Sequence, residues 1–166
     1  MLEGKCKVAV FVSGGGTNLQ AILDSRGKII KNADICLVAS NNKDAYALER
    51  AKKHDIETFI IEDEQRLVEK LKSLKIDFIV LAGYLRILSE DFCKRYSNRM
   101  INVHPSLIPS FCGKGFYGLK VHEKALEYGV KVSGATVHFV NEIPDGGKII
   151  DQRAVRVHEG DTAEDL

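Results

Sequence analysis

The stretch that decides the fold covers residues 7–23 and reads KVAVFVSGGGTNLQAIL. Its first part, Lys7 to Val12, is an almost continuous apolar run rich in β-branched residues, which is typical of a strand buried on both faces in a parallel sheet. Ser13, three glycines and Thr17 follow, and a pattern of helical spacing begins at Asn18. The stretch therefore predicts a strand, a glycine turn and the start of a helix.

The same alternation of strand and helix continues along the chain to residue 103. Asp44 and Ser89 stand directly before two helical patterns, and we expect each to cap its helix. Repeated strand–helix units favour a parallel sheet with helices on both faces, and right-handed crossovers place the carboxyl ends of its strands at one edge, where ligands bind. The strand patterns cover residues 35–39, 57–61, 78–82 and 100–103, and the helical patterns cover 45–51, 64–74 and 89–96.

Beyond Pro109 the pattern changes. A glycine-rich segment leads into a helical pattern at 120–128, in which we expect His122 to be an ordinary histidine on the helix surface. Residues 131–140 alternate with period two, and a second strand pattern covers 148–157 after a segment dense in turn-forming residues. The predicted fold class is therefore α/β, with an open, mostly parallel, doubly wound (Rossmann-like) sheet that has an antiparallel C-terminal end.

The composition indicates a near-neutral protein of one domain, residues 1–166, long enough to bury a core. The 24 basic and 23 acidic residues give no charge surplus that a nucleic acid or an acidic membrane would require. The four cysteines are scattered without a CxxC pair, so we expect no metal. No secretory segment or apolar run of membrane-spanning length occurs, and we expect no membrane partner and a reducing, cytoplasmic setting.

The glycine turn is a candidate anion site. Helix N-termini offer unpaired amides and the positive end of a dipole, and glycines let a phosphate approach the backbone closely. A dinucleotide loop would need glycine where Leu19 stands and an acidic residue after the second strand, where Ser40, Asn41 and Asn42 stand. No GK[ST] follows the glycines either. The turn predicts a phosphorylated metabolite rather than NAD or ATP, with a plain tight turn as the alternative.

Asn102 and His104 form a second candidate site. They lie two residues apart at the end of a short apolar run that Pro105 ends, so both side chains point to the same face of a strand. An amide and an imidazole so placed are able to hold a carbonyl and to move a proton. The alternative is a capped strand end with two satisfied polar side chains.

Asp145 lies in the turn-rich segment before Gly146 and Gly147. It is either a simple turn residue or, if this segment folds over His104, the carboxylate that favours the charged form of the imidazole.

Four motifs give the chain its resemblance to a known family: Ser13–Gln20, Leu81–Leu88, Asn102–Leu107 and Asp145–Gly147. The chain resembles the phosphoribosylglycinamide formyltransferases, from Lys7 to its last residue. The resemblance implies a formyltransferase fold and transfer of a formyl group from 10-formyltetrahydrofolate, a co-substrate, to the amine of N1-(5-phosphoribosyl)glycinamide in purine synthesis. It implies small-molecule substrates, no metal, and a monomer or homodimer.

The resemblance also implies roles for individual residues. Asn102 would hold the formyl oxygen, His104 would be the general acid, and Asp145 would keep His104 charged and relay protons. The phosphoribosyl substrate would bind Gly15, Gly16, Thr17 and Asn18. The folate would bind Leu85, Arg86, Ile87, Leu88, Asn102, Val140, Asn141 and Glu142.

Two departures from the family pattern bear on the folate. The family's Ser-Arg pair after the third strand is missing, and Arg66 falls within a helical pattern instead. The family's Gly-Gly-Pro is Gly146-Gly147-Lys148 here.

The main alternative function is that of a formyltetrahydrofolate deformylase, which uses the same residues on water. Its motif typically has a histidine where this chain has Pro105, and it carries a preceding regulatory domain. The formylase of initiator tRNA needs a long extension, and a non-catalytic metabolite-binding domain would not need Asn102, His104 and Asp145 together.

The last residues, 160–166, have the pattern of a helix start, with Asp161 or Thr162 as the cap. We expect the chain as given to lack a C-terminal helix, because a single turn is too short to be stable alone.

Overall fold

The structure is a computed structural model and describes residues 4–166, which divide into two compact units after Arg86. The first unit has four strands, all parallel, in the order β3-β2-β1-β4. Its elements along the chain are β1 (Cys6–Val12), α1 (Thr17–Ser25), β2 (Ala33–Ser40), α2 (Tyr46–Lys52), β3 (Glu57–Ile60), α3 (Glu64–Ser73) and β4 (Phe78–Leu81).

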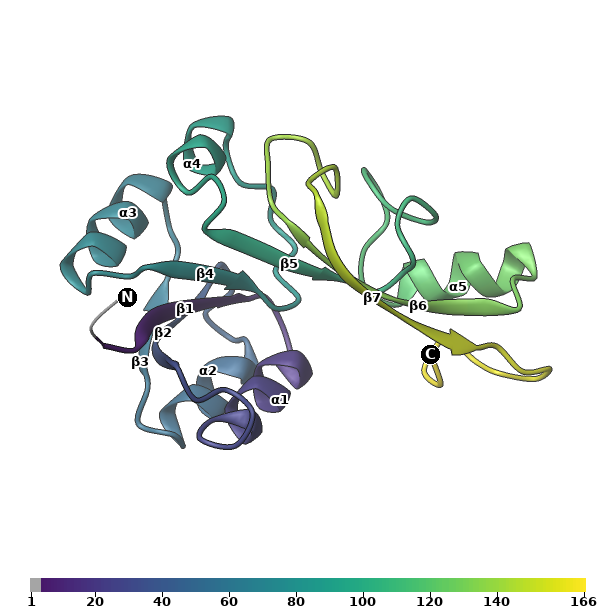
Figure 1. Ribbon diagram of the computed structural model, residues 1–166, viewed down its shortest axis with the longest axis horizontal. Helices are drawn as coiled ribbons and strands as arrows, with labels where there is room; N and C mark the ends of the chain where they lie inside the picture. Colours follow the sequence, from purple (N-terminus) through teal and green to yellow (C-terminus); the bar gives the residue numbers. More distant parts are fainter. Residues whose placement is uncertain (1–3) are drawn as a thin grey trace. The chain divides into compact units, whose positions relative to one another are not determined.

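Helices cover both faces of these four strands. Figure 1 shows α1 and α2 on one face and α3 on the other. On the α1–α2 face, Val8, Val10 and Val12 of β1 pack in one cluster with apolar residues of both helices. The intervening Ala9 and Phe11 are also fully buried. Strand β1 is therefore buried on both faces, as its continuous apolar run predicts.

The second unit begins at Ile87 and contains an antiparallel sheet. The three strands run in the order β5-β6-β7, and Asn102 of β5 lies directly opposite His138 of β6. The elements are α4 (Glu90–Arg95), β5 (Met100–His104), α5 (Leu119–Tyr128), β6 (Val132–Phe139) and β7 (Ile149–Arg156).

These elements confirm the predicted fold class, with parallel strands and alternating helices first and antiparallel strands at the C-terminal end. The expected cap of α4 is confirmed, because the Ser89 hydroxyl accepts the Phe92 N–H at 3.1 Å. The expected cap of α2 is wrong. Helix α2 starts after Ala45 without a side-chain cap, and the Asp44 N–H instead donates to Asn42 Oδ1 at 3.0 Å.

The C-terminal residues 161–166 form turns in this structure. Both the backbone N–H and the hydroxyl of Thr162 donate to the carboxylate of Asp165, at 2.8 and 2.7 Å.

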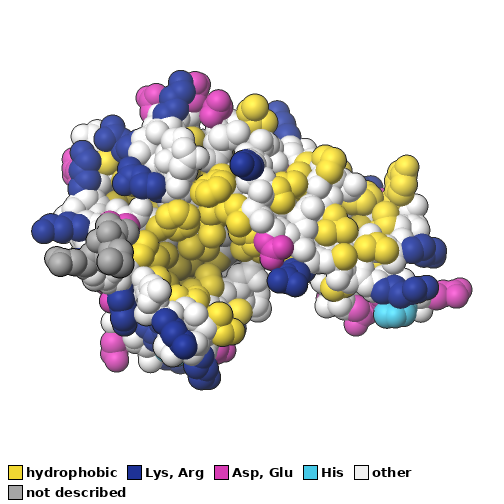
Figure 2. Space-filling model, viewed as in Figure 1, with side chains coloured by type: hydrophobic (Ala, Val, Ile, Leu, Met, Phe, Trp, Pro, Cys, Tyr) yellow, Lys and Arg dark blue, Asp and Glu magenta, His cyan; other side chains and the backbone are white. Residues whose placement is uncertain are grey.

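The surface of each unit carries charges of both signs, which occur together on the face seen in Figure 2. Among residues 4–166, no helix has the length and apolar character needed to cross a membrane.

Candidate active site

The glycine turn of the first unit leaves the start of α1 open. Gly16 precedes the helix in a left-handed conformation, with φ of 74°, and no side chain caps the first turn. Gly15, Thr17 and Asn18 are exposed there. The amides at this helix start are therefore available to an anion, as the sequence predicts.

Helix α2 packs against the glycine turn. A Cβ atom on Gly16 would lie 2.6 Å from the Cβ of Ala47, closer than real side chains approach, and the positive φ also favours glycine. Glycine at position 16 is thus required twice, by backbone conformation and by the contact with α2.

Ser13 joins the carboxyl ends of three strands of the first unit. Its hydroxyl donates to Asn41 Oδ1 at 2.6 Å, and it accepts the Leu85 N–H at 2.8 Å. The glycine turn and the segment after β4 therefore meet at one edge of this sheet. That His104 also gathers at this edge stays a prediction.

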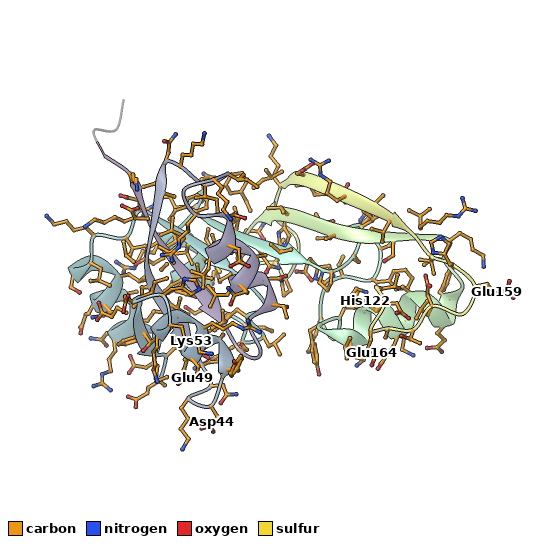
Figure 3. All side chains as sticks on the ribbon, turned by 90° about the horizontal axis from the view of Figure 1, so that it is seen from below. Asp44, Glu49, Lys53, His122, Glu159 and Glu164 are labelled. Carbon is orange, nitrogen blue, oxygen red and sulfur yellow. The ribbon has the colours of Figure 1, made fainter. Side chains whose placement is uncertain are left out.

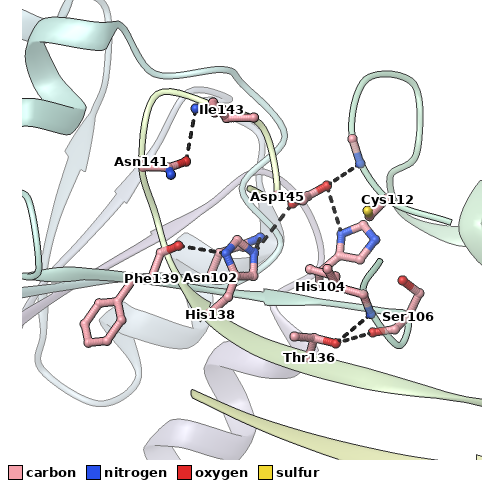
Figure 4. Close-up of polar contacts among 12 residues, drawn as sticks. Asn102, His104, Ser106, Cys112, Thr136, His138, Phe139, Asn141, Ile143 and Asp145 are labelled. Atoms are coloured by element: carbon pink, nitrogen blue, oxygen red, sulfur yellow. Dashed lines mark hydrogen bonds and ion pairs between the residues drawn. The ribbon is translucent and has the colours of Figure 1, made fainter. Parts of the chain in front are cut away.

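The residues proposed for the folate differ in exposure. Leu85 and Ile87 are apolar yet 55% and 70% exposed, whereas Leu88 is buried. In the second unit Val140 continues β6, where its N–H donates to Met100 O at 2.9 Å. Asn141 Oδ1 accepts the Ile143 N–H at 3.0 Å and shapes the loop that carries Asp145 (Figure 4). Arg86 and Glu142 are exposed.

His104 lies at the end of β5 and is only 4% exposed. Its Nε2–H donates to the carbonyl oxygen of Phe111 at 2.9 Å, and its Nδ1 lies 3.5 Å from Asp145 Oδ2. A carbonyl and a carboxylate both accept hydrogen bonds, so both ring nitrogens of His104 face acceptors. The structure thus brings His104 and Asp145 together, as proposed.

Asp145 is presented by a tight turn. Its own φ is 55°, a conformation that Asp tolerates better than most residues. A Cβ on Gly147 would lie 1.7 Å from the Phe139 carbonyl oxygen, and one on Gly146 would lie 2.6 Å from the side chain of Ile143. Both glycines are therefore needed to aim the carboxylate.

The surroundings of Asp145 stabilise its charge. Burial raises its pKa, but the hydrogen bond with His138, the Gly113 N–H at 2.8 Å and the proximity of His104 outweigh burial, so the pKa lies below its ordinary value. Asp145 is consequently ionised at neutral pH.

His138 is a site residue that the sequence reasoning missed. It is 2% exposed, its Nδ1–H donates to the Phe139 carbonyl at 2.8 Å, and its Nε2 lies 3.6 Å from Asp145 Oδ1 and 3.2 Å from Asn102 Nδ2 (Figure 4). His138 thereby links Asn102 to Asp145. The period-two pattern of β6 places it on the face of Thr136, but only the register of β6 against β5 places it beside Asn102.

His122 is less exposed than the ordinary surface histidine expected from the sequence. It lies on α5 (Figure 3), partly buried, and its Nδ1 is fully enclosed without a hydrogen-bond partner among residues 4–166. Burial and the nearby positive charge of His104 lower the pKa of His122. His122, close to His104, is therefore neutral at pH 7.

The sequence model of the formyl transferase family matches residues 6–166. The chain belongs to the formyl transferase family. It is 41% identical, over 96% of its length, to the chloroplastic phosphoribosylglycinamide formyltransferase of Arabidopsis thaliana and spans 58% of that protein. It is 40% identical to the phosphoribosylglycinamide formyltransferase of Haemophilus influenzae, with 96% of this chain and 77% of that protein covered.

Solved structures of the family agree with this fold. The phosphoribosylglycinamide formyltransferase of Anaplasma phagocytophilum matches with a TM-score of 0.88 and 37% identity, over 96% of this chain and 76% of that one. A formyltetrahydrofolate deformylase from Pseudomonas syringae matches with a TM-score of 0.85 and 30% identity, over 98% of this chain and 55% of that one. The chain is thus more similar in sequence to the Anaplasma phagocytophilum formyltransferase than to the Pseudomonas syringae deformylase.

Proposed function

We propose that this chain transfers the formyl group of 10-formyltetrahydrofolate to the amine of N1-(5-phosphoribosyl)glycinamide, a step of purine synthesis. The observation that carries the proposal is the buried contact of His104 with Asp145 in a formyl transferase, beside an Asn102 amide fixed by His138. The names of the relatives described above support the choice of the amine substrate.

The proposed reaction is an acyl transfer that needs no electrons from outside. The amine nitrogen bonds to the formyl carbon, and the C=O electron pair moves onto oxygen to give a tetrahedral oxyanion. The bond from carbon to N10 of the folate then breaks, N10 takes a proton, and the amine nitrogen loses one. Donors already aimed at the oxyanion supply much of the rate in such reactions.

Two side chains are proposed as those donors. The Asn102 amide, whose Nδ2 lies 3.2 Å from His138 Nε2, is proposed to present an N–H to the formyl oxygen. His104 would donate from Nε2, the ring nitrogen opposite Asp145. In this structure Nε2–H is bound to the Phe111 carbonyl, so the formyl oxygen would replace that carbonyl as the acceptor.

The substrates are proposed to bind at opposite ends of the reacting bond. The phosphate would accept hydrogen bonds from the amides of Gly15, Gly16, Thr17 and Asn18. The pteridine would contact the segment after β4, in which the apolar side chains of Leu85 and Ile87 are exposed. The cysteines in the described part of the chain are free, and we propose a reducing, cytoplasmic setting for the enzyme.

The phosphate assignment offers a sharp test of this function. We expect phosphoribosyl glycinamide to be formylated, with the product identified by its mass, and the same riboside without its phosphate to react with a much lower kcat/KM. Equal kcat/KM for the two amines would contradict the proposal. Formate as the only product would favour the deformylase instead.

A further inference from the structure

Two carbonyl groups of the glycine turn, those of Gly14 and Gly15, accept hydrogen bonds from α2. The Gly14 carbonyl accepts the Ala47 N–H at 3.1 Å, and the Gly15 carbonyl accepts Arg50 Nε–H at 2.8 Å. The first contact is made by backbone and needs no particular side chain at position 47 beyond a small one. The second depends entirely on Arg50.

Arg50 is itself held in place by two further contacts. Its Nη1–H donates to Gln20 Oε1 on α1 at 2.9 Å, and its Cζ lies 5.0 Å from the centre of the Tyr46 ring. Gln20 in turn donates from Nε2 to Asp24 at 2.9 Å. The guanidinium therefore connects the glycine turn, α1 and α2 with a fixed geometry, which a planar fork of donors allows.

These contacts decide which side of the turn faces a ligand. A peptide carbonyl repels an anion and a peptide N–H attracts one, so an anion site needs the carbonyls turned away. Arg50 fixes the Gly15 carbonyl on the α2 side, and it leaves a positive charge behind the turn.

We infer that Arg50 is a positioning residue for the phosphate of the substrate, acting through the Gly15 carbonyl. The inference rests on the proposed function only in taking the glycine turn as the phosphate site. It predicts that loss of Arg50 weakens binding of the phosphorylated amine and leaves the formyl transfer chemistry in the second unit unchanged.

Lys53 provides a matched control. It lies at the end of α2, its Nζ is 5.7 Å from the centre of the same Tyr46 ring, and its described contact is with the Tyr46 hydroxyl rather than with the turn (Figure 3 labels it). Lys53→Met therefore removes one positive charge from the same region as Arg50→Met does, without releasing the Gly15 carbonyl.

The experiment measures KM for the phosphoribosyl amine, KM for the folate, and kcat in Arg50→Met, Arg50→Lys and Lys53→Met. We expect Arg50→Met to raise KM for the amine about tenfold, the size expected for a hydrogen bond to a charged group. Arg50→Lys should recover part of this loss, and kcat and KM for the folate should stay within about twofold in all three variants. An unchanged KM for the amine in Arg50→Met, an equal rise in Lys53→Met, or a general loss of kcat with both KM values would overturn the inference.

Binding without turnover separates this inference from the proposed function. Titration calorimetry measures the dissociation constant of ribose 5-phosphate at the glycine turn in the wild type and in each variant, even if no formyl transfer is found. Should Arg50→Met fail to fold, Gln20→Met, which removes the acceptor of Nη1, should weaken ribose 5-phosphate binding by a smaller factor. Equal affinity of the wild type and Gln20→Met would then count against the inference.

Discussion

The Nδ1 atom of His104 lies 3.5 Å from the Oδ2 atom of Asp145, and the two side chains are only 4% and 13% exposed. The chain also contains an exposed pair of the same type, His158 and Asp161, at 3.7 Å, in which His158 is 70% exposed. Burial makes the difference, because a desolvated charge pair is strong and is not screened by salt, whereas an exposed pair contributes little. The two pairs therefore offer a natural comparison.

We predict that His104→Ala and Asp145→Asn each lower kcat about 10²–10⁴-fold, the range for a positioned acid or base. Asn102→Ala should lower it by a similar factor, because an oxyanion donor contributes about 10²–10³. His158→Ala and Asp161→Asn serve as controls and should keep kcat within about twofold. Near-normal kcat in a purified, folded His104 or Asp145 variant would remove that residue from the mechanism.

His138 should control the acid side of the pH profile. The hydrogen bond with His138 helps to keep the pKa of Asp145 low. We expect activity to be lost as pH falls through that pKa. In His138→Ala the pKa of Asp145 should rise, so the fall of kcat should begin at a higher pH than in the wild type. His138→Gln, which keeps a polar group, should lie between the two. An acid limb that stays in place in His138→Ala would show that His138 does not act through Asp145.

Gly16 should be needed for the substrate as well as for stability. Gly16 and Gly27 both have φ of 74°, but only a Cβ on Gly16 meets a neighbour, Ala47. Each Gly→Ala change should cost about 1–2 kcal/mol of unfolding free energy for the left-handed conformation, and Gly16→Ala should cost more because its Cβ would also meet Ala47. Only Gly16→Ala should also raise KM for the phosphoribosyl amine. Chemical denaturation and steady-state kinetics measure the two effects, and equal KM values in both variants would refute the assignment of the turn.

His122 should make the protein less stable in mild acid. Its folded-state pKa is lowered, so the unfolded chain binds a proton more readily, near its ordinary pKa of about 6.5, and acid favours unfolding. The stability of the wild type should therefore decline as pH falls below that value, and His122→Gln should decline less over the same range. Urea unfolding at pH 7 and at pH 5 measures both slopes. Parallel slopes would mean that His122 is not the titrating group.

Much of the fold was predictable from local pattern. The apolar run of β1 decides its burial, and Ser89 caps α4 as its residue type suggests. The cap expected from Asp44 failed because the residue at the N-cap position of α2 is Ala45, one residue further along the chain. A shift of one residue at a helix boundary is decided by tertiary context and is not visible in a residue pattern.

In the candidate site, too, some contacts follow from the sequence and others only from the tertiary structure. Asn102 and His104 share a face because strands have period two, so their proximity follows from sequence. His138 joins them through strand register. The contacts of Phe111 and Gly113 are made by backbone atoms, so the residue types at these positions do not reveal them. The role of Arg50 could not be predicted from the sequence, because the atom that it contacts is a backbone carbonyl 35 residues away.

The central claim, transfer of formyl to an amine rather than to water, is tested most directly by measuring the consumption of 10-formyltetrahydrofolate with and without phosphoribosyl glycinamide. The account predicts that one formylated amine appears for each folate consumed, and that consumption without the amine falls to the rate seen with His104→Ala. Equal consumption in both conditions, with release of formate, would contradict the account.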